Sequence, residues 1–151
     1  AIKACSSPQS FLGINDEGQI STFRAKGNKA SHIVLRGGKT PNYSKEDVAN
    51  CADMLKNNSL PERIMVDCSH GNSSKDYRLQ GQVVSDVGQQ IADGSTSLFG
   101  IMIESNLFAG NQSIPDDLSQ MQYGVSVTDG CIDWAETENV LRKLREQISS
   151  S

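Results

Sequence analysis

Three residues whose side chains can bind anions or metals recur at equal spacing along the chain. Arg36, His70 and Glu104 lie 34 residues apart, and each ends an apolar run: SHIVLR, RIMVDCSH and LFGIMIE. A loop follows each run, and in most cases a segment with helical spacing follows the loop. A repeating strand–helix unit sets its strands parallel, so their C-terminal ends open on one side. The sequence therefore predicts that a guanidinium, an imidazole and a carboxylate converge at that edge, where α/β folds place their chemistry.

Asp129, in the stretch SVTDGC, adds a second carboxylate to this group. His70, Glu104 and Asp129 together offer one nitrogen and two oxygen donors, a set that suits Mn²⁺, Fe²⁺ or Zn²⁺. Water or a further residue would have to complete the coordination shell. Plainer interpretations remain open, with His70 as a hydrogen-bonded residue at a strand end and Asp129 as a turn former before Gly130. The carboxylate of Glu104 favours function, because a carboxylate at the end of a buried strand is costly unless it is paired or bound to a metal.

Arg36 precedes Gly37-Gly38-Lys39, and this pattern is compatible with anion binding. A guanidinium binds phosphate or carboxylate through two parallel hydrogen bonds, and the glycines let backbone N–H groups approach the anion. A surface arginine before a turn explains the motif equally well. Asp67, of opposite strand parity to His70, could orient neighbouring side chains, and Lys75 could bind an anion or be solvated.

The composition bounds the possible partners. The chain has 151 residues, a formal net charge of −4 and a pI near 5.1, which argue against a nucleic-acid or membrane-surface partner. No apolar run approaches the ~20 residues of a membrane span. The N-terminus has no initiator Met and no signal-type apolar region, so the chain is expected to begin within a longer one. The four cysteines have no CxxC spacing and are expected to be free thiols in a reducing compartment, so the predicted location is the cytoplasm: Cys5, Cys51, Cys68 and Cys131.

The predicted elements form one partial α/β domain over residues 1–151. A β-hairpin is expected over about residues 10–27 and three strand–helix units over about 31–149. A closed (β/α)₈ barrel takes about 250 residues, so this chain would supply about three of eight units. Alone, its open sheet would expose long apolar edges. The apolar stripes of the first and last helices are expected to comprise Val48, Cys51, Met54, Leu55, Val140, Leu141, Leu144 and Ile148, with Trp134 also packed on the last helix.

Several strings closely resemble the C-terminal part of the 3-deoxy-D-arabino-heptulosonate-7-phosphate (DAHP) synthases of the first, bacterial and fungal, type. They are VLRGGKTPNYS, MVDCSHGNSSKDYR, GIMIESNLFAGNQS and YGVSVTDGCIDW, and the resemblance covers essentially the whole chain. It implies the C-terminal part of a (β/α)₈ TIM barrel with an inserted β-hairpin. The implied activity condenses phosphoenolpyruvate with erythrose 4-phosphate and releases phosphate, which opens the shikimate pathway to the aromatic amino acids.

The same resemblance assigns roles to the residues at the strand ends. His70, Glu104 and Asp129 match three of the family's four ligands for a divalent metal, and Arg36 matches a residue that binds phosphoenolpyruvate. Arg36 and His70 are therefore the candidate catalytic residues. The family's N-terminal half is absent, and with it the cysteine ligand, a lysine, further arginines and much of the dimer interface. The isolated chain is expected to be inactive, and the complete protein is expected to be a homo-oligomer. Cys68 is expected one layer deeper than His70, a poor position for a ligand.

The hairpin SFLGIN…ISTF resembles strands that help to form the family's inhibitor site for an aromatic amino acid. Phe11, Gly13 and Phe23 fall at positions that line or neighbour that pocket. The sequence stretches FLGIN and MVDCSHGN resemble the tyrosine-sensitive members most, so tyrosine is the expected inhibitor.

Two other functions remain open from the sequence. The chain could be a non-catalytic regulatory or complementing fragment that binds an aromatic amino acid or pairs with another half-barrel, and tyrosine binding without metal binding would support that. Without the resemblance, a small flavodoxin-like metal-dependent hydrolase of phosphorylated substrates is the third candidate. Release of phosphate from simple esters would favour it.

Overall fold

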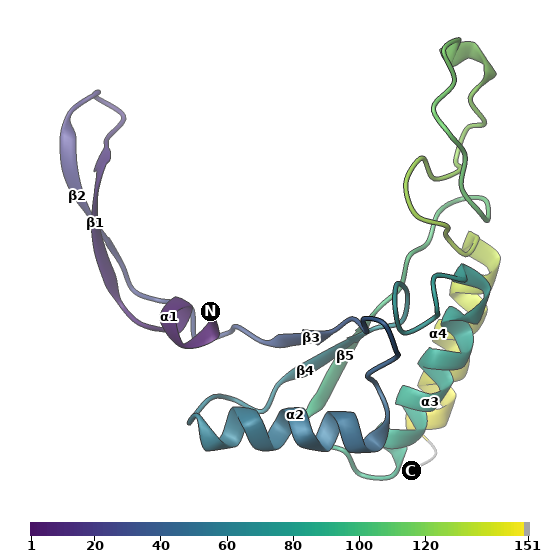
Figure 1. Cartoon of the computed structure of the whole chain (residues 1–151), viewed down its shortest axis with the longest axis horizontal. Helices are drawn as coiled ribbons and strands as arrows, with labels where there is room; N and C mark the ends of the chain where they lie inside the picture. The colour runs from purple at the N-terminus through teal and green to yellow at the C-terminus, as the bar shows by residue number, and fades with distance from the viewer. Residues whose placement is uncertain (150–151) are drawn as a thin grey trace.

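The computed structural model describes residues 1–149 and shows a mixed α/β fold (Figure 1). The expected domain, 1–151, extends two residues beyond this described part. A three-stranded sheet carries helices on one side, and an antiparallel strand pair extends away from it. The elements in chain order are α1 Ile2–Ser6, β1 Gln9–Ile14, β2 Ile20–Ala25, β3 Ile33–Leu35, α2 Lys45–Asn57, β4 Ile64–Asp67, the 3-10 helix η1 Tyr77–Leu79, α3 Gln80–Ala92, β5 Leu98–Met102, the 3-10 helix η2 Leu118–Gln120 and α4 Trp134–Ser149.

Strands β3, β4 and β5 are parallel and neighbour one another in that order. Their C-terminal ends therefore lie at one edge of the sheet. The strands are shorter than the apolar runs in the sequence, so Arg36, His70 and Glu104 all follow the last paired residue of their strand. Positive φ angles at Gly37 (72°) and His70 (49°) turn the chain out of the sheet at these points. The candidate residues thus lie on the loops at the strand ends rather than within the strands.

The hydrophobic core lies between the sheet and the helices. Helices α2 and α3 contact the strands, and α4 packs against α3. A capping box between Ser44 and Asp47 starts α2. The fully or nearly fully buried members of the core are Val48, Leu55, Ile64, Val66, Cys68, Val83, Val84, Val87, Leu98 and Val140. These side chains anchor the strands whose ends carry the site.

Some helical residues are more exposed than the apolar pattern predicts. The predictions were wrong for Met54, which is 68% exposed, and for Trp134, which is 64% exposed. Leu55 and not Met54 faces the core, and Met54 instead lines an apolar cavity of about 350 Å³ together with Ile2 of α1. On α4 the covered stripe is narrow because this helix packs mainly against α3. Leu141 and Ile148 are likewise exposed, and Cys51 is only partly buried.

The opposite face of the sheet is uncovered. Val34, Phe99 and Met102 are exposed there, and His32 makes an edge-on ring contact with Phe99 at 4.9 Å between centroids. Phe99 is the extra residue of a bulge in β5, between the pairs Ile64–Leu98 and Met65–Gly100. Apolar strand residues therefore lie on both faces of the sheet.

Strands β1 and β2 pair antiparallel, with Phe11 opposite Phe23 and Gly13 opposite Ser21. Asn15 shapes the turn between them, since its side-chain oxygen accepts hydrogen bonds from the backbone N–H groups of Glu17 and Gln19. The pair extends away from the parallel sheet as a two-stranded ribbon (Figure 1). Within residues 1–149, no helix combines the length and the hydrophobicity needed to cross a membrane.

Candidate metal centre at the strand ends

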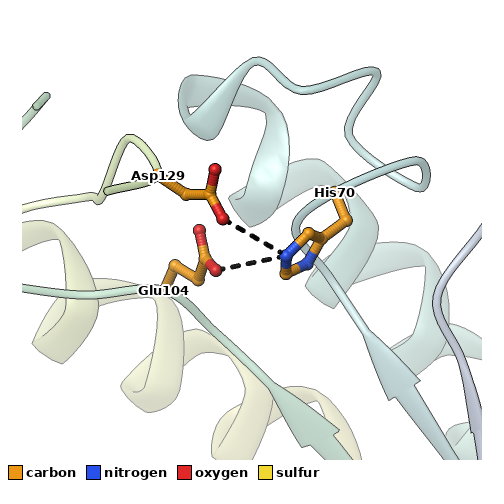
Figure 2. A group of neighbouring side chains, drawn as sticks. All are labelled: His70, Glu104 and Asp129. Atoms are coloured by element: carbon orange, nitrogen blue, oxygen red, sulfur yellow. Dashed lines mark ion pairs between the residues drawn. The ribbon is translucent and has the colours of Figure 1, made fainter.

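The side chains of His70, Glu104 and Asp129 meet beyond the ends of β4 and β5 (Figure 2). Nε2 of His70 lies 3.4 Å from Oε1 of Glu104 and 3.5 Å from Oδ2 of Asp129. One donor atom from each residue lies within 4.8 Å of the others. Tetrahedral ligands bound at about 2.0–2.2 Å from an ion lie about 3.3–3.6 Å from one another, so the two distances from Nε2 of His70 fit a divalent metal. The 34-residue spacing predicts that His70 and Glu104 meet at one edge, and the structure brings them together. Asp129, a candidate by residue type and not by the repeat, joins them, whereas Arg36 does not.

His70 is held by its own loop and by a buried carboxylate. Its backbone has a positive φ, and its carbonyl accepts a 2.7 Å hydrogen bond from the N–H of Lys75. Nδ1 is buried and lies 2.9 Å from Oδ2 of Asp67, although it makes no well-aligned hydrogen bond. The other oxygen of Asp67 accepts a hydrogen bond from the N–H of Ser69. A carboxylate beside one ring nitrogen directs the other nitrogen toward a metal, so Asp67 has the orienting position expected of it.

Glu104 is fixed through its side chain and its backbone. The hydroxyl of Ser69 donates to Oε2 at 3.0 Å, which leaves Oε1 facing His70. The side chain of Gln80 bonds both the N–H and the carbonyl of Glu104, and the N–H of Ile132 donates to the same carbonyl. Strand β5 ends before Glu104, yet the backbone N–H and carbonyl of Glu104 are both hydrogen-bonded, as they would be within a sheet.

Asp129 belongs to the loop before α4 and is the most exposed donor, with 67% of its side chain accessible. The next residue, Gly130, packs against the ring of Tyr77, because a Cβ at Gly130 would lie 2.6 Å from Cδ1 of that ring. Cys131 and Gly110 exchange backbone hydrogen bonds of 2.9 and 3.1 Å just beyond. The carboxylate is therefore carried by a loop that is anchored directly after Asp129.

A cavity of about 110 Å³ opens at the three donors. Its lining contains the donors themselves together with Ser69, Lys75, Tyr77 and Gly130. The cavity has room for an ion and a few waters or the reacting end of a small substrate. Lys75 brings the cationic side chain to this lining, in a loop where Ser74 and Lys75 both have positive φ. Strained backbone of this kind is concentrated at functional sites.

Arg36 is not part of this cluster. Its side chain is exposed, it does not line the cavity, and it has no ion pair or hydrogen bond to any residue in 1–149. Its loop is nevertheless tied to the His70 loop, because Gly37 and Gly71 pack backbone to backbone with no room for a Cβ at either. Buried Asn72 joins the same two loops: its amide nitrogen donates to the carbonyls of Leu35 and Asp67. The position of Arg36 relative to His70 is therefore constrained at the backbone.

Cys68 does not reach the donors. It is fully buried, and burial together with the charge of Asp67 raises the pKa of its thiol to about 12. Cys68 does not line the cavity at the donors, which agrees with its expected position one layer deeper than His70. All four cysteines are free in the structure.

Sequence reasoning missed three residues that support the site: Ser69, Asn72 and Gln80. Ser69 lies beside a recognised candidate and could have been inferred from that. Asn72 and Gln80 occupy a loop and a helix start, where polar residues are ordinary, so nothing in the sequence marks their burial.

The candidate inhibitor-site residues lie together on the β1–β2 ribbon. The rings of Phe11 and Phe23 stack with centroids 5.8 Å apart and planes 15° apart. Gly13 is next to them, and a Cβ there would lie 2.8 Å from Cε2 of Phe23. The three residues thus form one flat apolar face that remains exposed to solvent.

Comparison with known proteins matches residues 1–142 to the DAHP synthetase I family. The chain is 49% identical to the Tyr-sensitive phospho-2-dehydro-3-deoxyheptonate aldolase of Salmonella typhimurium, over 99% of this chain and 42% of that protein. It is 46% identical to the Tyr-sensitive protein of Enterobacter agglomerans, over 98% of this chain and 70% of that sequence. The solved structure of the corresponding aldolase from Francisella tularensis superposes with a TM-score of 0.89 at 44% identity, over 98% of this chain and 43% of that one. The chain spans about two fifths of the length of most of these relatives.

Proposed function

Since this chain belongs to the DAHP synthetase I family, we propose that it forms the C-terminal part of a metal-dependent DAHP synthase. The proposed reaction joins C3 of phosphoenolpyruvate to the aldehyde carbon of erythrose 4-phosphate. Water adds at C2 of phosphoenolpyruvate, and inorganic phosphate leaves. The observation that carries this proposal is the convergence of His70, Glu104 and Asp129 on one small cavity.

The proposed fold of the whole enzyme is a (β/α)₈ barrel, of which β3, β4 and β5 are consecutive strands. Their parallel order and the superposition on the Francisella tularensis structure support this proposal. The uncovered sheet face, with Val34, Phe99 and Met102, would then face the barrel interior, and the helices would form part of the outer ring. The hairpin β1–β2 would be an insertion in this barrel.

The metal would be held by Nε2 of His70 and by carboxylate oxygens of Glu104 and Asp129. A divalent ion there would supply Lewis-acid polarisation of a substrate oxygen or of water. The nitrogen and oxygen donors suit Mn²⁺, Fe²⁺ and Zn²⁺ alike. Asp67 keeps the His70 ring oriented, and Ser69 keeps one oxygen of Glu104 occupied so that the other faces the cavity.

Arg36 is proposed to bind an anionic group of phosphoenolpyruvate. Its guanidinium is exposed and has no carboxylate partner within residues 1–149, which leaves its donors available for a ligand. Its loop packs on the His70 loop through Gly37 and Gly71, so a substrate held by Arg36 would be placed at a set distance from the metal donors.

The proposed inhibitor is tyrosine, bound against Phe11, Gly13 and Phe23. Relatives named Tyr-sensitive share 46–49% identity with this chain, whereas those named Phe- or Trp-sensitive share 42–43%. The stacked rings supply an apolar surface that suits an aromatic side chain. A homo-oligomeric enzyme in the cytoplasm is part of the same proposal, and four free thiols are consistent with a reducing compartment.

The test is a condensation assay on the full-length enzyme that contains residues 1–151. Phosphate release should require phosphoenolpyruvate, erythrose 4-phosphate and a divalent metal together, and the His70→Ala variant should abolish it. His32→Ala is the matched control, since the other histidine contacts Phe99 on the uncovered sheet face and should keep its activity. Release of phosphate from simple esters without erythrose 4-phosphate would contradict the proposal and favour a hydrolase.

A non-catalytic role for the chain by itself is the second candidate, favoured by the exposed apolar ribbon. We expect the 151-residue chain alone to be inactive, because three fifths of the family's length is outside it. Titration of the isolated chain with tyrosine and with Mn²⁺ separates the two cases. Tyrosine binding without metal binding would identify a regulatory or complementing fragment, and normal turnover would show that the chain is sufficient.

A further inference from the structure

The neighbouring strand provides no hydrogen-bond partner for the backbone N–H and carbonyl of Glu104. Strand β5 ends at Met102, whose carbonyl accepts the last strand-to-strand hydrogen bond, from the N–H of Cys68. Glu104 continues beyond this point with a half-buried side chain. Its N–H and carbonyl therefore need partners from outside the strand ladder.

The side chain of Gln80 supplies these partners. Its amide oxygen accepts a hydrogen bond of 2.8 Å from the N–H of Glu104, and its amide nitrogen donates one of 3.0 Å to the carbonyl of the same residue. This pair of bonds is the one that the directly opposite residue of an antiparallel strand would make. Gln80 has no solvent exposure at all, so its amide has no competing water.

Both ends of this arrangement are anchored. Gln80 is the first residue of α3, a helix that packs into the core through Val83, Val84 and Val87. On the other side, the N–H of Ile132 donates to the Glu104 carbonyl at 3.1 Å. Ile132 follows Asp129 by three residues. The hydrogen bonds to the Glu104 carbonyl therefore connect the backbone of one carboxylate donor to the loop that carries the other.

We propose that Gln80 is a positioning residue for the metal centre, which sets the carboxylate of Glu104 opposite Nε2 of His70 before any metal binds. It does not touch the metal or the substrate. The inference rests on the proposed function only in that the cluster binds a divalent metal. A metal site needs its ligands held to within about 0.5 Å, and loss of a partner behind a ligand typically lowers metal affinity by about 10–100-fold.

The experiment compares Mn²⁺ affinity with fold stability in the full-length enzyme. Gln80→Met keeps the length and burial of the side chain but removes both hydrogen bonds. Val84→Ala is the stability control, because it lowers core packing on the same helix without touching the site. Gln82→Met is the chemical control: that exposed glutamine bonds only Asp86. Mn²⁺ dissociation constants come from calorimetry, and melting temperatures are measured without metal.

We expect Gln80→Met to weaken Mn²⁺ binding by at least tenfold, whereas Val84→Ala should stay within twofold of the parent enzyme even if it melts at a lower temperature. Gln82→Met should change neither quantity. Should Gln80→Met fail to fold, Gln80→Glu keeps the shape and the acceptor toward the Glu104 N–H, loses the donor, and should also weaken binding by at least tenfold.

A dissociation constant for Gln80→Met within twofold of the parent would overturn the inference, and so would an equal weakening by Val84→Ala. In either case the parent enzyme still binds Mn²⁺, so the proposed function survives. A parent enzyme that binds no divalent metal would overturn both proposals together.

Discussion

The strand-end site and the β1–β2 ribbon are the two candidate functional regions, and they are held in opposite ways. The site is polar, yet its supporting side chains are buried: Asp67, Asn72 and Gln80 are all within 3% of complete burial. The ribbon is rich in apolar side chains, yet Ile20 on it is 80% exposed. The main contacts of the ribbon are those between its own two strands, such as the stack of Phe11 on Phe23.

The difference follows from the kinds of force involved. Polar groups need partners at defined distances and angles, so a polar site has to be assembled by the chain that carries it. Apolar surfaces lack such directional needs and can be covered later by any complementary surface. The site is therefore preorganised within residues 1–149, while the ribbon depends for its cover on something outside its own strands.

The largest effect is expected when a donor side chain of the strand-end site is removed. His70→Ala removes the proposed nitrogen ligand, and we expect Mn²⁺ affinity of the full-length enzyme to fall by more than about 100-fold, beyond the range for supporting residues. Calorimetric titration measures the change, with His32→Ala as the control. Retention of affinity within tenfold would mean that the cluster is not the metal site.

Asn72→Ala tests whether the buried amide of Asn72 stabilises the two loops that follow β3 and β4. The change leaves the carbonyls of Leu35 and Asp67 and the N–H of Asn42 without this partner, and we expect a loss of about 2–4 kcal/mol in the free energy of unfolding. Urea denaturation measures it. Asn139→Ala, a half-buried residue of α4, loses only its hydrogen bond to Glu136 and should change stability by less than about 0.5 kcal/mol. Equal losses of stability in the two variants would show that the hydrogen bonds of Asn72 stabilise the fold no more than that of Asn139.

Asp67→Asn sharpens the comparison by changing one atom behind a ligand. The neutral amide no longer favours the orientation of the His70 ring, so Mn²⁺ affinity should fall by about tenfold with little change in stability. Asp53→Asn, at an exposed position of α2, is the matched control and should have no effect. An unchanged affinity in the Asp67 variant would show that the ring is oriented by its backbone alone.

The ribbon should give the smallest effect on the fold. Phe23→Ala removes one ring of the stack, and the melting temperature of the full-length enzyme should shift by less than about 2 °C, because the ring is already partly exposed. Inhibition by tyrosine should weaken at the same time. Phe108→Ala, an exposed phenylalanine elsewhere, should leave inhibition unchanged. A large loss of stability would mean that the ribbon is held more firmly than its exposure indicates.

The meeting of His70 and Glu104 could be predicted because a repeating strand–helix unit dictates where strand ends lie, whereas Asp129 lies outside that repeat and was a candidate by residue type alone. Arg36 follows the same repeat but has no partner at the cluster, since periodicity places the backbone and not the end of a long side chain. The buried roles of Asn72 and Gln80 could not be predicted. A helix start and a loop ordinarily carry solvated amides, and only the three-dimensional paths of neighbouring segments bury these two.

The pattern of exposure on the helices was predictable only in part. Helical spacing correctly places Val48, Leu55 and Val140 in the core, but it cannot say how wide a stripe the neighbouring elements cover. Trp134 is therefore apolar and exposed at once, since α4 packs mainly against α3.

The single amide of Asn72 has a consequence for anyone who redesigns this edge of the molecule. It reaches the ends of β3 and β4 and the backbone of Asn42, while Gly37 and Gly71 leave no gap between the two loops. Residues 35–42 and 67–72 thus form a single structural unit. A graft of the Arg36 loop onto another protein would have to include the His70 segment, because either segment alone would lack the backbone contacts that hold it in place.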